Sequence, residues 1–188
     1  MNRQPTLEGA LLLLRPLRED DWDALFAVAS DPLIWEVHPA NDRWQEPVFS
    51  EYFANALKYQ GALVVIDKHV LSSAEGASGQ IIGSSRMQWH DPADGGSVEI
   101  GWTFLARSHW GGECNREMKR LMLGHALQFV ERVDFQVGVT NLRSRRAMEK
   151  IGGRLTERTN TVEMAGGPVT HVIYEITRES FAAGPLSQ

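Results

Sequence analysis

The sequence predicts a mixed α/β fold of the α+β type, in which a mostly antiparallel central sheet of about six or seven strands is flanked by helices. Three extended runs between residues 61 and 105 are separated only by turn-forming residues, which is typical of an antiparallel meander. Helical periodicity precedes and follows this region. The 188 residues, 43% hydrophobic and 23% charged, predict one domain over 1–188.

The N-terminal part begins with a leucine-rich run over 7–17, which predicts a strand whose Pro16 favours an edge position. A helix over 18–30 should follow. It places apolar residues at i, i+3, i+4 and i+7, namely Trp22, Leu25, Phe26 and Ala29.

A loop over 33–46 has little periodicity, yet it carries Trp35 and His38. Because loops often form binding sites, we expect it to contribute a wall of a substrate site. A second helix is predicted over 47–59.

The meander follows, with strands over 62–67, 79–89 and 97–105 and turns over 69–78 and 91–96. Strict alternation in the strand over 97–105 would turn Glu99 away from the face that carries the bulkier side chains. That face would carry Val98, Ile100, Trp102 and Phe104.

The C-terminal half predicts a long helix over 112–130, a strand over 134–140 and a helix over 141–151 that ends at Gly152-Gly153. Two further strands, 154–162 and 170–177, flank a turn over 164–168. We expect residues 178–188 to form a frayed tail.

Composition excludes several function classes. The net charge of −5 argues against general nucleic-acid binding. The single Cys114 and the absence of Cys/His clusters indicate chemistry without a metal in a reducing compartment. Apolar runs are too short for a membrane span, so we expect a cytoplasmic protein.

Basic residues are concentrated between Arg116 and Lys150. This clustering indicates either an anionic ligand or ordinary solvated helix faces. Gly111-Gly112 precedes the long helix, and free N–H groups at a helix start bind phosphate when glycines allow close approach. Two glycines before a helix can also be a simple turn. Neither a dinucleotide fingerprint nor a phosphate-loop motif occurs.

Three segments in order, LLLRPLREDD at 12–21, VEIGW at 98–102 and NLRSRRAMEKIG at 141–152, make the chain resemble the GNAT acetyltransferase superfamily. The resemblance covers nearly the whole chain, and the nearest subgroup is that of the ribosomal-protein N-terminal acetyltransferases. Two positions depart from the family's pyrophosphate loop: Ser108 stands at its first position and Glu113 at its last small residue.

The resemblance implies that acetyl-CoA binds where the fourth and fifth strands, 97–105 and 134–140, splay into a V. Asn141 would contact the pantetheine arm or act as an ordinary helix cap, and Arg145 would approach the adenosine phosphates or remain solvated. Backbone N–H groups near Phe104 or Leu105 would stabilise the thioester oxyanion. The pyrophosphate would lie on the amides of Trp110, Gly111, Gly112, Glu113, Cys114 and Asn115.

For catalysis, the resemblance makes Glu99 the candidate base, with a structural ion-pair partner as the alternative. The family's tyrosine proton donor is replaced by Met148, so Ser144 or Tyr174 would protonate the leaving thiolate. Either could instead be a packing residue. Candidate substrate-binding residues are Trp35, His38 and Trp89.

Together these features predict an acetyl-CoA-dependent N-acetyltransferase in which a deprotonated primary amine attacks the thioester directly. The acceptor would be a protein N-terminus or a small-molecule amine. The alternative is a catalytically silent acyl-CoA-binding or regulatory module. The resemblance also allows a homodimer.

Overall fold

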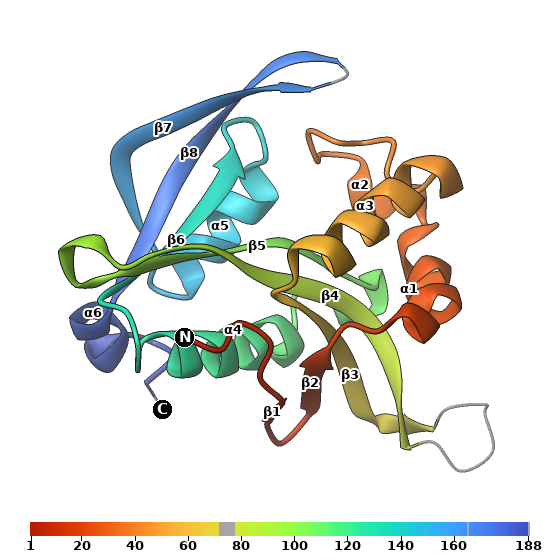
Figure 1. The fold of residues 1–188 in the computed structure, drawn as a ribbon, viewed down its shortest axis with the longest axis horizontal. Helices are drawn as coiled ribbons and strands as arrows, with labels where there is room; N and C mark the ends of the chain where they lie inside the picture. The colour runs from red at the N-terminus through yellow and green to blue at the C-terminus, as the bar shows by residue number, and fades with distance from the viewer. Residues whose placement is uncertain (72–77, 165, 188) are drawn as a thin grey trace.

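The computed structural model describes residues 1–71, 78–164 and 166–187. An eight-stranded sheet forms its centre, in the order β1-β2-β3-β4-β5-β6-β8-β7 (Figure 1). All neighbouring strands are antiparallel except β5 and β6. The predicted mixed, mostly antiparallel sheet is therefore confirmed.

The strands are β1 (Leu7–Glu8), β2 (Leu12–Pro16), β3 (Ala62–Leu71), β4 (Ser78–Asp91), β5 (Ser97–Leu105), β6 (Arg132–Gly138), β7 (Arg154–Met164) and β8 (Gly167–Thr177). The helices are α1 (Trp22–Ala29), α2 (Pro32–Trp35), α3 (Glu46–Tyr59), α4 (Glu113–Ala126), α5 (Leu142–Lys150) and α6 (Arg178–Ala183), with short 3₁₀ turns at Glu19–Asp21, Ala93–Gly95 and Arg107–His109. The predicted turns over 69–78 and 164–168 lie partly outside the described residues. No helix in the described part of the chain is long and apolar enough to cross a membrane.

The two faces of the sheet are covered by different helices. Leu63 and Val65 of β3 belong to a core shared with α4 and α5, whereas Val64 and Ile66 belong to an aromatic core shared with α1 and α3. Figure 1 shows α1 and α3 beside one half of the sheet and α4 across the other side. Because alternate strand residues point to opposite faces, one apolar strand supplies both cores.

Glu117 of α4 divides the predicted first strand into β1 and β2. Its buried carboxylate accepts hydrogen bonds from the backbone N–H groups of Ala10, Leu11 and Leu12, at 2.8, 2.9 and 2.8 Å. At Gly9, a Cβ would lie only 2.5 Å from the Glu117 carboxyl carbon. The turn between β1 and β2 is therefore built around this side chain.

A bulge interrupts β5, and the predicted alternation through Phe104 is wrong for this reason. Gly101 pairs with Arg86 and Phe104 pairs with Ser84, so two residues, Trp102 and Thr103, oppose a single residue of β4. Trp102 has a φ of 52°, in the left-handed region. Because side-chain direction alternates along a strand, the extra residue turns every residue after the bulge to the face opposite the one that strict alternation predicts.

The consequence is visible in the packing on either side of the bulge. Val98 and Ile100 lie in the core next to α4, whereas Phe104 lies in the opposite core, 5.2 Å from the Trp35 ring. Thr103 now faces α4, and its hydroxyl accepts a hydrogen bond from Lys119.

Strands β5 and β6 separate soon after they pair. Their parallel register includes only Ser97, Val98 and Glu99 of β5. Beyond Glu99, β6 continues to pair with β8 on its other side, as far as Gly138. Among the described residues, the edge of β5 from Ile100 to Leu105 thus has no neighbouring strand on that side, as the expected V requires.

The C-terminal segment is ordered, so the prediction of a frayed tail over 178–188 is wrong. Thr177 and Ser180 form a reciprocal capping box at the start of α6. Leu186 is only 1% exposed and belongs to the core next to α4. The short polar segment gave no periodic signal for a helix, and contacts with distant residues, including the docking of Leu186 on the core and the hydrogen bonds of Arg178 to the Leu127 and Val130 carbonyls, stabilise it.

We predict that Glu117→Gln lowers the free energy of unfolding by about 2 kcal/mol, because the amide would turn an N–H donor toward backbone donors. Urea denaturation followed by tryptophan fluorescence would measure this loss. The matched control is Glu113→Gln on the same helix, whose exposed side chain should contribute less than about 0.5 kcal/mol. Equal effects of the two substitutions would contradict the anchoring role of Glu117.

Candidate active site

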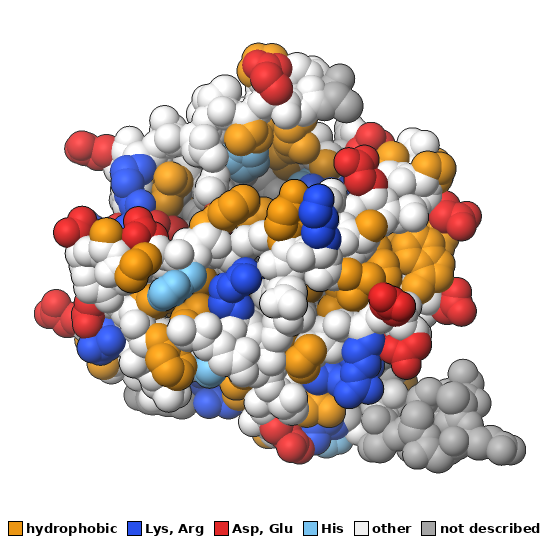
Figure 2. Space-filling model, viewed as in Figure 1, with side chains coloured by type: hydrophobic (Ala, Val, Ile, Leu, Met, Phe, Trp, Pro, Cys, Tyr) orange, Lys and Arg blue, Asp and Glu red, His pale blue; other side chains and the backbone are white. Residues whose placement is uncertain are grey.

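A cavity of about 620 Å³ occupies the gap between β5 and β6. Its walls include Ile100–Leu105 of β5, Phe135–Gly138 of β6 and residues of α4 and α5. Figure 2 shows the surface hollowed between the β7–β8 arm and the α3 region, with hydrophobic and histidine side chains at the rim. This volume suits an extended small-molecule ligand.

One end of the cavity is the turn that leads into α4. Gly111 has a φ of +71°, and a Cβ at Gly111 or Gly112 would meet no atom within 4 Å. Gly112 is the N-cap of α4 and supplies no side chain to the first N–H groups. These donors, with the positive end of the helix dipole, suit an anion.

Glu113 does not obstruct this turn. Its side chain is 77% exposed and its nearest cation, Arg116, lies 3.9 Å away. Trp110, Glu113 and Asn115 all line the cavity, whereas Cys114 does not. Burial raises the pKa of the Cys114 thiol above its ordinary value.

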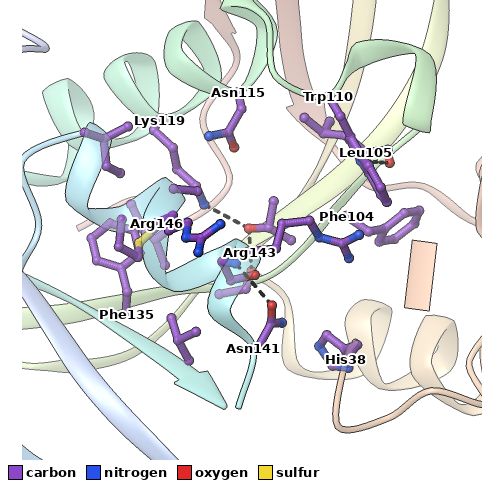
Figure 3. A pocket seen from close by; sticks show the side chains of 18 of the residues that line it. His38, Phe104, Leu105, Trp110, Asn115, Lys119, Phe135, Asn141, Arg143 and Arg146 are labelled. Atoms are coloured by element: carbon purple, nitrogen blue, oxygen red, sulfur yellow. Dashed lines mark hydrogen bonds between the residues drawn. The ribbon is translucent and has the colours of Figure 1, made fainter. Parts of the chain in front are cut away.

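The first two turns of α5 supply cations to the same cavity. Arg143 lies over the Trp110 ring at 4.1 Å and donates to the Ile34 carbonyl at 3.0 Å. Arg146 also lines the cavity (Figure 3). Neither guanidinium forms a salt bridge with any carboxylate in the described ranges.

Arg145, the predicted phosphate contact, points elsewhere. Its Nε donates to the Tyr174 hydroxyl and its Nη1 to the Val139 carbonyl, both at 3.2 Å. Successive helical residues are about 100° apart, so the cavity receives Arg143 and Arg146 instead. A helical wheel anchored on Asn141 would have indicated this.

Asn141 caps α5, as one of its two predicted roles requires. Its buried Oδ1 accepts a hydrogen bond from the Ser144 N–H at 3.1 Å. Both residues line the cavity. The cap therefore holds Ser144 beside the cavity.

Tyr174 lies away from the cavity, which conflicts with its predicted role as a proton donor. It is fully buried, and its hydroxyl is held between Arg145 and Glu149. Three residues earlier on β8, His171 lines the cavity instead. Residues three apart in a strand point to opposite faces, so His171 faces the cavity and Tyr174 faces away from it.

Glu99 lies at the point where β5 and β6 part. The carboxylate is 8% exposed and accepts a hydrogen bond from Gln136 Nε2 at 2.6 Å. Burial raises its pKa to about 7, Gln136 opposes the shift and Asp134 adds to it. Gln136 lines the cavity, and Glu99 lies directly behind it. No cation in the described part of the chain forms a salt bridge with Glu99, so the ion-pair alternative finds no partner there.

Trp35 and His38 line the other end of the cavity, but Trp89 does not. Trp35 is held by its indole N–H, which donates to the Ala29 carbonyl at 2.7 Å. Burial, followed by the charge of Arg43, lowers the pKa of His38 to about 3. Trp89 is 63% exposed and does not line the cavity, although it lies beside Trp102, which does.

Lys119 is a cavity residue that the sequence-based reasoning missed. It is 2% exposed, and its Nζ donates to Thr103 Oγ1 at 2.9 Å. Burial lowers its pKa to about 7. A signal was present, because Lys119 stands at apolar-stripe spacing from Met122 and Ala126.

Comparisons with known proteins agree on the fold. A family model described as the acetyltransferase (GNAT) domain matches residues 12–154. The structure of a GCN5-related N-acetyltransferase from Brucella melitensis is similar, with a TM-score of 0.75, 23% identity and coverage of 96% of this chain and 81% of that one. The comparison with curated proteins gave no match.

Two further solved structures are similar. For an acetyltransferase (GNAT family) from Bacillus anthracis, the TM-score is 0.69 at 18% identity, with 93% of this chain and 99% of that one covered. For Mycobacterium smegmatis RimJ in complex with CoA-disulfide, it is 0.67 at 18% identity, with 94% and 86% covered. At such identities these likenesses concern the fold alone.

We predict that the imidazole of His38 stays neutral from pH 8 down to pH 5, because its pKa is about 3. Since an unfolded histidine has a pKa of about 6.5, this site stabilises the fold above pH 6.5 and loses that contribution as the pH falls toward 3. Histidine side-chain NMR across this pH range would measure the pKa of His38, with His38→Gln to assign the signal. Protonation between pH 6 and 7 would contradict the described burial.

Proposed function

The chain belongs to the GNAT acetyltransferase family, and from that premise we propose that it is an acetyl-CoA-dependent N-acetyltransferase. In this proposal a primary amine, from a protein N-terminus or a small molecule, attacks the thioester directly. The observation that carries it is the parting of β5 and β6 beside a glycine-capped helix start.

The residues present fit the coenzyme's chemistry. The open turn at Gly111 and the guanidinium groups of Arg143 and Arg146 suit its phosphates. The free edge of β5 offers backbone groups to its amide-bearing arm, because no strand in the described part of the chain covers Ile100–Leu105 there. The coenzyme supplies an activated acetyl group, and the protein supplies binding and orientation.

Glu99 is the proposed acceptor of the amine's proton. Because Gln136 separates it from the cavity, we assign the transfer to an intervening water. A pKa of about 7 suits this role, since the carboxyl then takes up a proton at neutral pH without holding it too tightly.

Ser144 is the proposed proton donor to the leaving thiolate, because it lines the cavity and Tyr174 does not. Backbone N–H groups near Phe104 or Leu105 are proposed to stabilise the oxyanion. Trp35 and His38 would contact the acceptor.

A cytoplasmic location, a homodimer and membership in the ribosomal-protein N-terminal acetyltransferase subgroup stay proposals. The likeness to a RimJ structure supports the subgroup only at 18% identity. The alternative, a silent acyl-CoA-binding module, is favoured by Met148 at the family's tyrosine position. Release of free thiol in the presence of an amine panel would distinguish an enzyme from such a module.

We predict that Arg146→Met weakens acetyl-CoA binding about tenfold, because it removes one charge-assisted contact. Isothermal titration calorimetry at fixed ionic strength would measure the dissociation constant. Arg145→Met is the matched control, since it removes the same charge from the adjacent residue outside the cavity. Equal losses in the two variants would show a general charge effect and contradict the assignment.

We predict that kcat/KM rises with pH and levels off above about 7, as Glu99 becomes ionised. Glu99→Gln should remove this limb and lower the neutral rate about 100-fold. Asp134→Asn is the companion variant. Because the negative charge of Asp134 raises the pKa of Glu99, its loss should shift the rise of kcat/KM to lower pH. Stopped assays with two acceptors of different amine pKa would separate the enzyme's limb from the acceptor's. A limb that persists in Glu99→Gln would contradict the base assignment.

A further inference from the structure

Resting on the proposed function, we propose that Lys119 is itself an acyl acceptor, so that the protein acetylates its own Lys119 when it is given acetyl-CoA without an amine. Nothing in the proposed reaction uses this side chain. It is nevertheless a primary amine that lines the cavity in which the thioester is proposed to lie.

The surroundings of Lys119 favour the neutral, nucleophilic amine. No carboxylate in the described part of the chain lies within salt-bridge distance of Nζ, and its hydrogen-bond partner is the neutral hydroxyl of Thr103. The neighbouring Arg120, by contrast, is partly exposed and approaches Glu117 at 3.9 Å. The Phe135 ring, 5.5 Å from Nζ, favours the ammonium. Burying an ammonium without a carboxylate partner is nevertheless costly, so burial lowers the pKa of Lys119 to about 7 and much of the side chain is uncharged near neutral pH. A desolvated lysine of this kind is an activated nucleophile.

The position of Lys119 brings this amine to the proposed reaction centre. Figure 3 shows its side chain reaching from α4 into the cavity toward β5. Its Nζ is 2.9 Å from the hydroxyl of Thr103, the residue next to Phe104. The backbone near Phe104 and Leu105 is where the thioester carbonyl is proposed to bind. The bulge at Trp102 creates this juxtaposition, because it turns Thr103 toward α4.

The chemistry is an ordinary aminolysis. The lone pair of neutral Nζ attacks the carbonyl carbon, the N–C bond forms and the C–S bond breaks. The thiolate leaves with its electron pair and takes up the proton that Nζ loses, so the products are acetyl-Lys119 and free coenzyme A. The new amide is uncharged, which removes the cost of an unpaired buried ammonium.

The experiment incubates the full chain with isotopically labelled acetyl-CoA and no amine, after intact mass spectrometry has defined the starting acetylation. Peptide mass spectrometry then follows the label at Lys119 and at Lys58, an exposed lysine that reports uncatalysed acetylation. We expect Lys119 to be labelled at least about tenfold faster, because binding converts the reaction to an intramolecular one. Unfolding the protein in urea should reduce Lys119 to the rate of Lys58.

Two variants keep the proposal falsifiable. Lys119→Arg keeps a long basic side chain that lacks a primary amine, and Lys119→Met keeps an unbranched side chain. Both should lose the fast label in the intact protein, and thermal unfolding would confirm that each is folded. Equal rates at Lys119 and Lys58, or an undiminished fast label in the folded variants, would overturn the proposal.

The same preparation separates this proposal from the proposed function. If acetyl-CoA binds by calorimetry and added amines are acetylated while Lys119 stays unlabelled, self-acetylation is overturned and the enzyme assignment stands. If acetyl-CoA neither binds nor releases thiol, the proposed function fails and self-acetylation fails with it.

Discussion

The structure depends on one constraint, the separation of two neighbouring strands that share a sheet. Strands β5 and β6 pair through Glu99 and then diverge, which leaves one edge of β5 without a partner strand in the ranges that the structure describes. Buried backbone groups must be hydrogen-bonded, so such an edge persists where a ligand or water can reach it. The starts of α4 and α5 both face this gap, and the same divergence therefore determines where their N–H groups and cations can act.

The divergence also explains two unusual ionisable side chains. Glu99 lies behind the gap on the β5–β6 side and Lys119 lies in it on the α4 side, each without a salt bridge among the described residues. Burial is the main cause for both, raising one pKa and lowering the other until each is about 7. Burial thus brings the pKa values of a carboxyl group and an amine near neutrality without pairing the two groups.

Much of the fold was predictable because it follows from local patterns. Turn-forming residues delimit the meander, and Asn141 stands where a helix cap is expected. The bulge at Trp102 could not be predicted, because one extra residue does not visibly change the alternation of apolar residues along a strand of only nine residues. Nor could the docking of Leu186, which depends on a core assembled from distant segments. For the candidate site, the glycine turn was predictable, whereas the choice of Arg143 and Arg146 over Arg145 required the rotation of α5.

The bulge has a consequence for how this strand tolerates changes in length. Deleting Trp102 would restore a regular pleat in which Gly101 and Phe104 keep their partners on β4, so Thr103 and Phe104 would keep their present faces. If the strand instead straightened at its present length, Phe104 would turn to the face of α4 and leave the rings of Trp35 and Phe49. Divergent sequences sharing this architecture should therefore carry β5 either at this length with a bulge or one residue shorter without one, and larger insertions should accumulate in the loops that precede Ser97 or follow Leu105.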